Sequence, residues 1–230
     1  MNEEKRNLKI VFCLPGNNFS GKFLTAWSEL LQWCIKQNIK VIISQKYSSM
    51  VHFARSSCLC GDNRRGPDQK PFDGKIDYDY IMWIDSDIIF SVKNFIKLLV
   101  ANKDVVCGLY KMEGGTKYAV VENWDLNYWE NNGTFQFLDD TILENKRNNC
   151  ELIDNKFLKV SYSGLGWMLI KKGVIEKIQY PWFESERLEH KQYRDICSED
   201  VSFCKKILKA GFKIYLDTTI RVGHLKTHII

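Results

Sequence analysis

Apolar and polar positions alternate in two distinct patterns along the first half of the chain. Four near-continuous apolar runs are typical of strands buried on both faces of a sheet; they lie at 8–16, 40–44, 80–84 and 105–110. Three segments between the runs carry apolar residues at helical spacing, the second with a serine at its expected N-cap; they lie at 23–37, 48–59 and 92–103. Strands that alternate with helices predict an α/β domain with a mostly parallel central sheet flanked by helices.

The pattern changes after residue 110. Residues 116–140 are rich in β-forming residues and turn pairs, which predicts hairpins. Residues 157–178 indicate a strand, a glycine-rich turn, a second strand and a helix. Residues 198–217 predict a helix with Ser198 as its N-cap and Gly211 just beyond its end, and then a strand. We therefore expect one domain with a smaller mixed β region in its second half.

Composition excludes several classes of protein. Hydrophobic and charged contents of 45% and 27% are those of a soluble globular protein. The net charge of +5 is mild and the basic residues are scattered, which argues against a nucleic-acid binder but suits an anionic ligand such as a nucleotide. No apolar run approaches the roughly 20 residues of a membrane span, and the start of the chain lacks the features of a signal peptide. We expect a cytoplasmic protein without a transmembrane segment.

Two aspartates interrupt the apolar run 80–90. Burial of a carboxylate without a partner costs several kcal/mol, so their position needs a reason. Asp85 and Asp87 directly follow the predicted strand, at the edge of an α/β sheet where ligands bind. Acids two residues apart on an extended segment point to the same side and can share a divalent cation. Alternatively, one of the two caps the following helix and the other is solvated.

The segment YDYIMWIDSDIIF, residues 78–90, resembles the D-x-D strand of GT-A glycosyltransferases, enzymes with a Rossmann-like fold that transfer a sugar from a nucleotide donor. The resemblance implies that Asp85 and Asp87 hold Mn²⁺ or Mg²⁺ against the donor diphosphate. It also implies that Pro15, Asp85 and Ser86 contact the donor, which is expected to be a UDP-sugar.

The segment SSMVHFARSSC, residues 48–58, is similar to the helix that precedes the D-x-D strand in many of these enzymes. The resemblance implies that Arg55 faces the nucleotide, assisted by Ser48 and Ser49. A surface arginine on an amphipathic helix is the alternative. The polar, Gly- and Pro-rich stretch 61–75 that follows is predicted to be a loop, either a solvated insertion or a flap over the donor.

The segment SYSGLGWMLIKKGVIEKI, residues 161–178, resembles the family's G-x-G-F-M-L-I-x-R pattern. The resemblance implies that Gly164 and Gly166 let the backbone approach the donor and acceptor sugars. Trp167, and Trp182 further along, would then offer aromatic faces on which a sugar stacks. A tight turn with core tryptophans is the competing explanation.

The segment that begins SED at 198–200 and continues to AGFKI resembles the acidic helix start of inverting GT-A enzymes. The resemblance implies that Asp200 is the general base that deprotonates the acceptor hydroxyl. Glu199 would bind a sugar hydroxyl or orient the site. Carboxylates also occur at helix N-termini for purely structural reasons, which is the alternative.

The tail IRVGHLK, residues 220–226, resembles the C-terminal segment that supplies a histidine ligand in many GT-A enzymes. The resemblance implies that His224 is the third protein ligand of the metal, and imidazole suits Mn²⁺ beside two carboxylates. Lys226 would neutralise the donor phosphates. A structural role for the histidine is the alternative.

Taken together, these segments cover nearly the whole chain and imply one GT-A domain over 1–230, with a nucleotide-binding half at 1–110 and an acceptor and catalytic half at 111–230. The implied reaction moves a sugar to a glycan or other hydroxyl acceptor with inversion. A looser likeness to small glycosyltransferase domains of large algal viruses and phages would place the protein in a host cytoplasm. A nucleotidyltransferase and a non-catalytic sugar-binding module remain as alternatives, and the oligomeric state cannot be read from the sequence.

Overall fold

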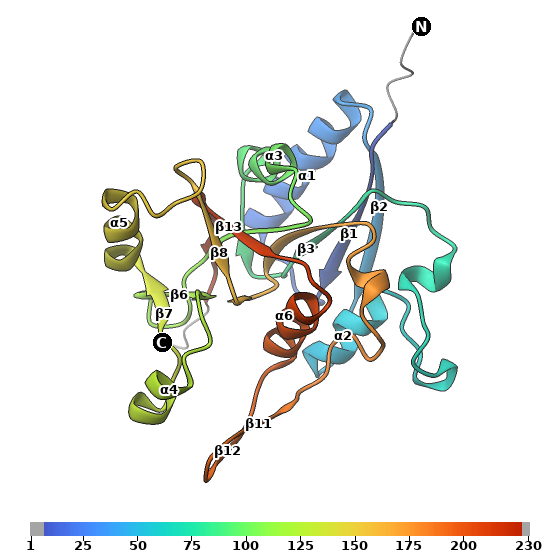
Figure 1. Cartoon of the computed structure of the whole chain (residues 1–230). Helices are drawn as coiled ribbons and strands as arrows, with labels where there is room; N and C mark the ends of the chain where they lie inside the picture. Colours follow the sequence, from blue (N-terminus) through green and yellow to red (C-terminus); the bar gives the residue numbers. More distant parts are fainter. Residues whose placement is uncertain (1–6, 227–230) are drawn as a thin grey trace, which may run out of the picture.

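The structure, a computed structural model, describes residues 7–226. Residues 1–6, part of the start at which no signal peptide is expected, lie outside that range. A seven-stranded sheet with strand order β2-β1-β3-β10-β5-β13-β8 forms the centre (Figure 1). Its strands are β1 (Lys9–Pro15), β2 (Lys40–Lys46), β3 (Tyr80–Ile84), β5 (Val105–Leu109), β8 (Phe157–Val160), β10 (Trp167–Lys171) and β13 (Ile214–Arg221).

Most of the sheet is parallel, as the alternation of strands and helices predicts. Strands β2, β1, β3, β5 and β13 run in one direction, whereas β10 is antiparallel to both of its neighbours and β8 is antiparallel to β13 at the edge. The insertion of β10 matters for the site. Because Trp167 at its start pairs with Ile84 at the end of β3, the turn before β10 lies at the carboxyl end of β3, beside Asp85.

Helices cover both faces of the sheet (Figure 1). The apolar side chains of α1 (Gly21–Lys36) and α3 (Val92–Ala101) pack with one set of strand residues, and those of α2 (Val51–Cys58) and α6 (Glu199–Lys209) pack with the other. Successive strand residues point to opposite faces, so β3 contributes to both layers of the core. All five residues of this strand are buried, which explains its continuous apolar run.

Most helix boundaries within 7–226 follow local signals, but α2 lacks its predicted cap, and Ser198 stands at the predicted N-cap of α6 without a side-chain cap bond. The Ser91 hydroxyl caps α3 in a capping box with Asn94, and Gly211 has the positive φ expected just beyond α6. The predicted serine N-cap of α2 is wrong, because Met50 occupies that position and makes no side-chain cap. The Ser48 hydroxyl instead accepts a hydrogen bond from the Met50 N–H, ahead of the helix.

The second half contains the predicted smaller β region and two helices that the sequence pattern misses. A three-stranded antiparallel sheet, in the order β7-β6-β9, stands beside the central sheet. Its members are β6 (Lys117–Val121), β7 (Phe137–Asp139) and β9 (Tyr162–Ser163). The hairpins predicted over 116–140 are wrong in part, because α4 (Leu126–Asn132) separates β6 from β7 and α5 (Asp140–Asn148) follows. Asp125 caps α4, and left-handed Gly133 ends it.

Short elements complete the chain. The helix predicted near 173–178 is a single 3-10 turn, η3 (Ile175–Lys177). The hairpin of β11 (Arg187–His190) and β12 (Tyr193–Ile196) projects from the body (Figure 1). Strand β14 (Gly223–His224) pairs with β4 (Ile88–Ile89).

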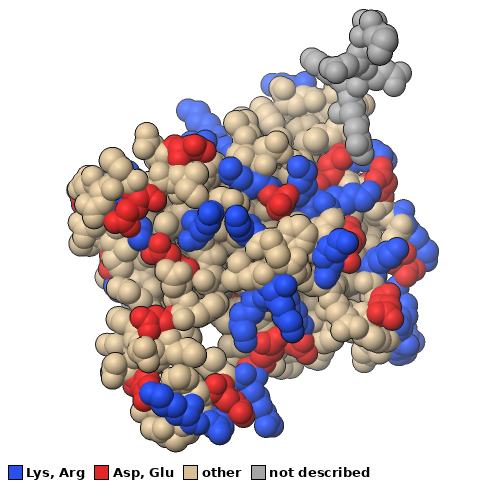
Figure 2. Space-filling view, in the orientation of Figure 1, with Lys and Arg blue, Asp and Glu red and all other residues tan. Residues whose placement is uncertain are grey.

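The loop 61–75 contains two more 3-10 turns, η1 (Asn63–Arg65) and η2 (Pro71–Gly74). Phe72 anchors the second turn in the core against Tyr78, at a ring distance of 5.5 Å. Figure 2 shows positive and negative side chains interspersed over the face in view. No helix within 7–226 has both the length and the apolar character needed to cross a membrane.

Candidate active site

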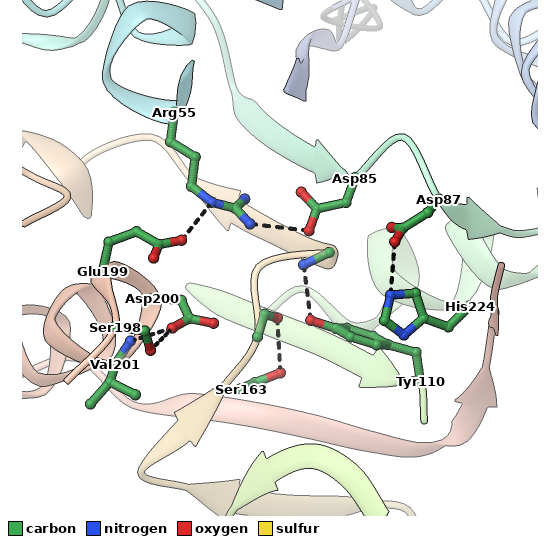
Figure 3. Close-up of polar contacts among 12 residues, drawn as sticks. Arg55, Asp85, Asp87, Tyr110, Ser163, Ser198, Glu199, Asp200, Val201 and His224 are labelled. Carbon is green, nitrogen blue, oxygen red and sulfur yellow. Dashed lines mark hydrogen bonds and ion pairs between the residues drawn. The ribbon is translucent and has the colours of Figure 1, made fainter. Parts of the chain in front are cut away.

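Asp85 lies where β3 ends, with its backbone fixed by the turn before β10. Its N–H donates to the Gly166 carbonyl at 3.1 Å. Its Oδ2 accepts from Arg55 Nη2 at 3.0 Å, whereas its Oδ1 is buried without a hydrogen-bond partner among the described residues (Figure 3). A buried carboxylate oxygen that lacks a donor destabilises the fold by about 1–3 kcal/mol. One oxygen of Asp85 is therefore available to a ligand.

Arg55 links the D-x-D segment to the start of α6. The side chain is 4% exposed, and its Nε donates to Glu199 Oε1 at 3.2 Å while Nη2 holds Asp85. The guanidinium lies over the Trp83 ring, 5.8 Å from its centroid. Burial opposes the charged form, but the nearby carboxylates outweigh it and raise the pKa of Arg55. Burial and the charge of Asp200 raise the pKa of Glu199.

Asp87 is held by the C-terminal segment. The pairing of β14 with β4 and a 2.7 Å bond from Leu225 N–H to the Asp87 carbonyl bring this tail alongside. His224 Nε2 lies 3.0 Å and Lys226 Nζ 3.1 Å from Asp87 Oδ2. Although burial opposes ionisation, these two bonds lower the pKa of Asp87, and the same contact raises the pKa of His224. His224 Nδ1 lies 2.7 Å from the Lys111 carbonyl, which only accepts, so Nδ1 carries the proton and donates.

The glycine-rich turn fits around Tyr110. Gly166 N–H donates to the Tyr110 hydroxyl at 3.3 Å, and a Cβ on Gly164 would lie 1.9 Å from the same oxygen. A Cβ on Gly166 would approach Asp85 Oδ2 to 3.2 Å, which is a tight contact, whereas at Gly164 only a glycine fits beside Tyr110 in this arrangement. The Tyr110 ring packs edge-on against His224 at 5.2 Å. Burial, and then the charges of Asp85 and Asp200, raise the pKa of Tyr110.

Asp200 stands at the first turn of α6 and is held by neutral donors. Tyr162 donates its hydroxyl proton to Oδ2 at 2.9 Å, and the Ser198 hydroxyl donates to Oδ1. The Val201 N–H donates to Oδ1 at 2.9 Å. In Figure 3, the Glu199 side chain points to Arg55, whereas the Asp200 carboxylate lies beside Ser198 and has no cationic partner in the view. Two adjacent acids thus have different surroundings.

The resemblance also assigns Pro15, Ser86 and Ser48, with Ser49, to the donor site. Pro15 ends β1, and a Cβ on the following Gly16 would lie 2.6 Å from Ser86 Oγ, so the end of β1 touches the D-x-D segment. Ser48 and Ser49 lie before α2, where the Ser48 hydroxyl contacts backbone and not the acids.

The structure contradicts the predicted sugar-stacking role of Trp167 and Trp182. Both side chains are 0% exposed, so neither presents a face to a ligand. Trp167 stacks on Phe90 at 4.9 Å, and Trp182 packs edge-on against Tyr180 at 5.3 Å. The reason is that strand alternation turns Trp167 into the layer between the sheet and helices α1 and α3.

Tyr110 and Tyr162 belong to the site but are not among the residues predicted from the sequence. Tyr110 follows β5, which ends at the same edge of the sheet as β3. Because ligands bind at that edge of an α/β sheet, this position in the sequence indicates Tyr110 as a candidate site residue. Tyr162 stands two residues before Gly164, but nothing in the local sequence shows that it reaches Asp200 from 38 positions away.

The candidate ligand atoms of Asp85, Asp87 and His224 suit a divalent cation, although they do not surround a single point. Within 7–226, no three His, Cys, Asp or Glu side chains are grouped so that they could hold a metal ion. Asp85 is engaged by Arg55, and Asp87 by His224 and Lys226. Two carboxylates and an imidazole are nevertheless suitable ligands for Mn²⁺. The unpartnered Asp85 Oδ1, and a His224 ring oriented through Nδ1 by a backbone carbonyl, fit that use.

No protein-family profile and no curated protein sequence matches the chain. Solved structures do. A197 from STIV has a TM-score of 0.54 and 19% identity, and the match covers 96% of this chain and 86% of that one. GalNAc-T7, solved with UDP, GalNAc and Mn²⁺, has a TM-score of 0.51 and 13% identity over 97% of this chain, which spans 45% of the GalNAc-T7 chain. At such identities the likeness shows the fold alone. The chain has the GT-A type of fold, as its sequence predicts.

Proposed function

We propose that this protein is a metal-dependent glycosyltransferase that moves a sugar from a nucleoside-diphosphate sugar, expected to be a UDP-sugar, to a hydroxyl of a glycan or other acceptor. One observation carries the proposal: Asp85 of the D-x-D segment and Glu199 at the α6 start meet through Arg55 at the carboxyl end of the sheet. The GT-A fold, shared with a glycosyltransferase that binds UDP and Mn²⁺, supports it.

The donor would lie at the ends of β1 and β3. Asp85, Asp87 and His224 would hold Mn²⁺ or Mg²⁺, and the bound ion would supply neutralisation of the leaving diphosphate. Lys226, whose side chain is 38% exposed, would contact the phosphates, with Pro15, Ser48 and Ser86 as the other proposed donor contacts. Arg55 would orient Asp85 through the hydrogen bond from its Nη2 to Oδ2.

The acceptor would lie next to Asp200, on the other side of the glycine-rich turn. Asp200 accepts the proton of the acceptor hydroxyl as that oxygen attacks the anomeric carbon of the donor sugar. Because the attack comes from the face opposite the leaving diphosphate, the configuration of the anomeric carbon is inverted. Gly164 and Gly166 let the two substrates approach along the backbone. Glu199 is buried against Arg55, which supports a role in orienting the site instead of contact with a sugar hydroxyl.

Nucleotide release tests the proposal. The protein is incubated with Mn²⁺ and a panel of nucleotide sugars, with and without acceptor glycosides, and release of nucleoside diphosphate is measured. We expect release from one donor, its loss with EDTA, and its loss in Asp87→Ala while circular dichroism stays unchanged. The control Asp77→Ala removes an exposed acid that pairs with Lys9 and Lys172 and should have no effect.

Three outcomes would contradict the proposal in different ways. Release of pyrophosphate from a nucleoside triphosphate and a sugar phosphate would indicate a nucleotidyltransferase. Sugar binding without release from any donor would indicate a binding module. A product that keeps the donor's anomeric configuration, measured by NMR, would exclude Asp200 as the base of a single displacement.

A further inference from the structure

A small cavity with aromatic walls lies beside Asp200. It has a volume of about 230 Å³ and opens between the α4 segment and the β11–β12 hairpin. Its lining comes entirely from the second half of the chain: Trp124, Trp129, Gly133, Thr134, Phe135, Phe137, Tyr162, Leu188, Asp195, Ile196, Cys197, Ser198 and Val201. None of these residues belongs to the D-x-D segment or to β1, where the donor is proposed to bind.

The aromatic side chains form a connected wall. Trp124 packs edge-on against Phe135 at 4.8 Å and lies 5.9 Å from Tyr162, while Trp129 is parallel to Phe135 at 6.2 Å. Trp124 is only partly buried, and its indole N–H is shielded from solvent without a hydrogen-bond acceptor among the described residues. Such a surface offers an apolar face together with an unused donor.

Three lining residues, Tyr162, Ser198 and Val201, hold Asp200. Tyr162 donates to Oδ2 at 2.9 Å, and Ser198 donates to Oδ1. A molecule in the cavity therefore lies one side chain away from the proposed base. Tyr162 and Ser198 would contact a molecule in the cavity and the Asp200 carboxylate at the same time.

The hairpin is fixed over the cavity. Lys191, between β11 and β12, pairs with Glu130 of α4 at 2.6 Å, and Tyr193 packs edge-on against Trp129 at 5.6 Å. Ile196 at the rim is 69% exposed, which its place at the end of β12 does not explain. An exposed apolar side chain beside aromatic rings and a few polar groups is typical of a binding surface.

We propose that this cavity binds one sugar ring of the acceptor, with the apolar face of the ring on the Trp124 and Phe135 wall and its hydroxyl groups toward Thr134, Asp195 and Ser198. Its role as an acceptor subsite rests on the proposed function, but sugar binding does not. Cavities for drug-sized molecules have roughly 300–1,000 Å³, so this smaller volume suits a single ring. The rest of a glycan would extend over Ile196. This site takes the place of the wall that the sequence assigns to Trp167 and Trp182.

Binding of simple glycosides without donor or metal tests the sugar site directly. A panel of methyl glycosides is screened by saturation-transfer NMR, and the best binder is titrated. We expect Trp124→Ala to weaken binding by roughly tenfold or more, as removal of a central aromatic contact does. Ile196→Ser, at an exposed position that the fold does not depend on, should weaken it by about two- to fivefold.

The matched control is Trp33→Ala, which removes a partly buried tryptophan of α1 that packs on Phe95, far from the cavity. Binding should be unchanged in this variant. The inference is overturned if no methyl glycoside binds, or if both Trp124→Ala and Ile196→Ser bind like the wild type. Binding of octyl but not methyl glycosides, with competition by octanol, would also overturn it, because the site would then recognise an alkyl chain.

Steady-state kinetics separate this inference from the proposed function. With a working donor, Trp124→Ala should raise the acceptor KM while metal-dependent donor hydrolysis without acceptor stays the same. An unchanged acceptor KM would overturn the subsite and leave the glycosyltransferase intact. Glycoside binding that depends on Trp124, combined with no nucleotide release from any donor, would instead refute the proposed function and leave the sugar site standing.

Discussion

Asp85 and Asp87 at the end of β3 differ from Asp200 at the start of α6 in the groups that hold their carboxylates. The β3 pair is held by side chains that carry or can carry positive charge: Arg55 binds one acid, and His224 and Lys226 bind the other. Asp200 receives hydrogen bonds from two hydroxyl groups and one backbone N–H, all neutral. Glu199 belongs with the first group, since Arg55 binds it as well.

This difference separates two kinds of chemistry. The charge of an acid that is paired with a cation is already balanced. A bound cation can take the place of the side-chain partner beside the acid, and a bound anion can pair with that side-chain partner, so that no charge is left without a partner. An acid held by neutral donors keeps its full negative charge and a fixed direction, which suits a group that accepts a proton. The comparison therefore supports the proposal of charge neutralisation on the β3 side and of proton transfer to Asp200.

The largest expected effect comes from Asp200→Asn. The amide keeps the size of the side chain but cannot accept a proton at neutral pH, and general-base catalysis contributes about 10²–10⁴-fold, so kcat should fall by that order. Donor Kd, measured by calorimetry, should stay near the wild-type value. Asp139→Asn, at the N-cap of α5, is the control for an altered acid at a helix start. A loss of donor affinity as large as the loss of kcat would contradict the proposal that donor binding and proton transfer belong to different sides of the site.

Arg55→Met should have the next largest effect, on stability. Removal of the cation leaves Asp85 and Glu199 without their partner, and breaking a buried ion pair from one side destabilises a protein by about 3–5 kcal/mol. Urea unfolding at pH 7 measures the difference. Lys146→Met is the matched control, because Lys146 also bridges two carboxylates but in a more exposed position, and it should cost about 1 kcal/mol or less.

The pH dependence of the Arg55→Met deficit follows from Glu199. Burial already raises the pKa of Glu199 in the folded protein, and loss of Arg55 raises it further. An acid with a raised folded pKa destabilises the fold above that pKa, and the penalty disappears as pH falls toward the ordinary value of 4.5. The stability difference from wild type should therefore shrink between pH 7 and about pH 4.5. A deficit that stayed constant on acidification would show that the guanidinium contributes packing and not charge.

His224→Ala should have a smaller effect that is confined to the metal. Loss of one of three proposed protein ligands should raise the Mn²⁺ concentration for half-maximal activity by roughly 10–100-fold, with a smaller change in kcat at saturating metal. Thermal shift with Mn²⁺ alone gives a second readout that does not require turnover. His190→Ala, on the β11–β12 hairpin, is the control. An unchanged metal requirement together with a lower Tm would make His224 a structural residue of the β14–β4 pair.

The two sides of the site also differ in how far sequence predicts them. The donor side depends on the continuous apolar strand β3, because Asp85 and Asp87 follow it at the edge of the sheet where ligands bind, and Arg55 of α2 reaches Asp85 there. His224 reaches this place through a two-residue strand pair, which the order of the family's motifs implies but no periodicity reveals. The α/β fold follows from the same apolar runs.

The acceptor side is less predictable because its geometry depends on tertiary contacts between short elements. Asp125 and Gly133 mark the ends of α4, but its seven residues are too few for a clear helical period beside so many β-forming residues. Trp167 illustrates a different limit: the sequence shows an aromatic residue beside a glycine turn but not which face of β10 it occupies. The reach of Tyr162 to Asp200 is fixed only when β9 packs beside α6.

Tyr162→Phe should have the smallest effect, and it tests how neutral donors tune Asp200. The ring stays in the aromatic wall, so the acceptor KM should change little, but the carboxylate loses its 2.9 Å bond. Loss of this bond removes one of the three donors that orient the carboxylate, so kcat should fall. The fall should be less than about tenfold, since one neutral hydrogen bond is worth about 0.5–1.5 kcal/mol. Tyr78→Phe removes a similar tyrosine-to-carboxylate bond, to Glu176 at 2.6 Å, and should leave kcat unchanged. If Tyr162→Phe also left kcat unchanged, the orientation of this carboxylate would not matter to the reaction, and Asp200 would lose its assignment as the base.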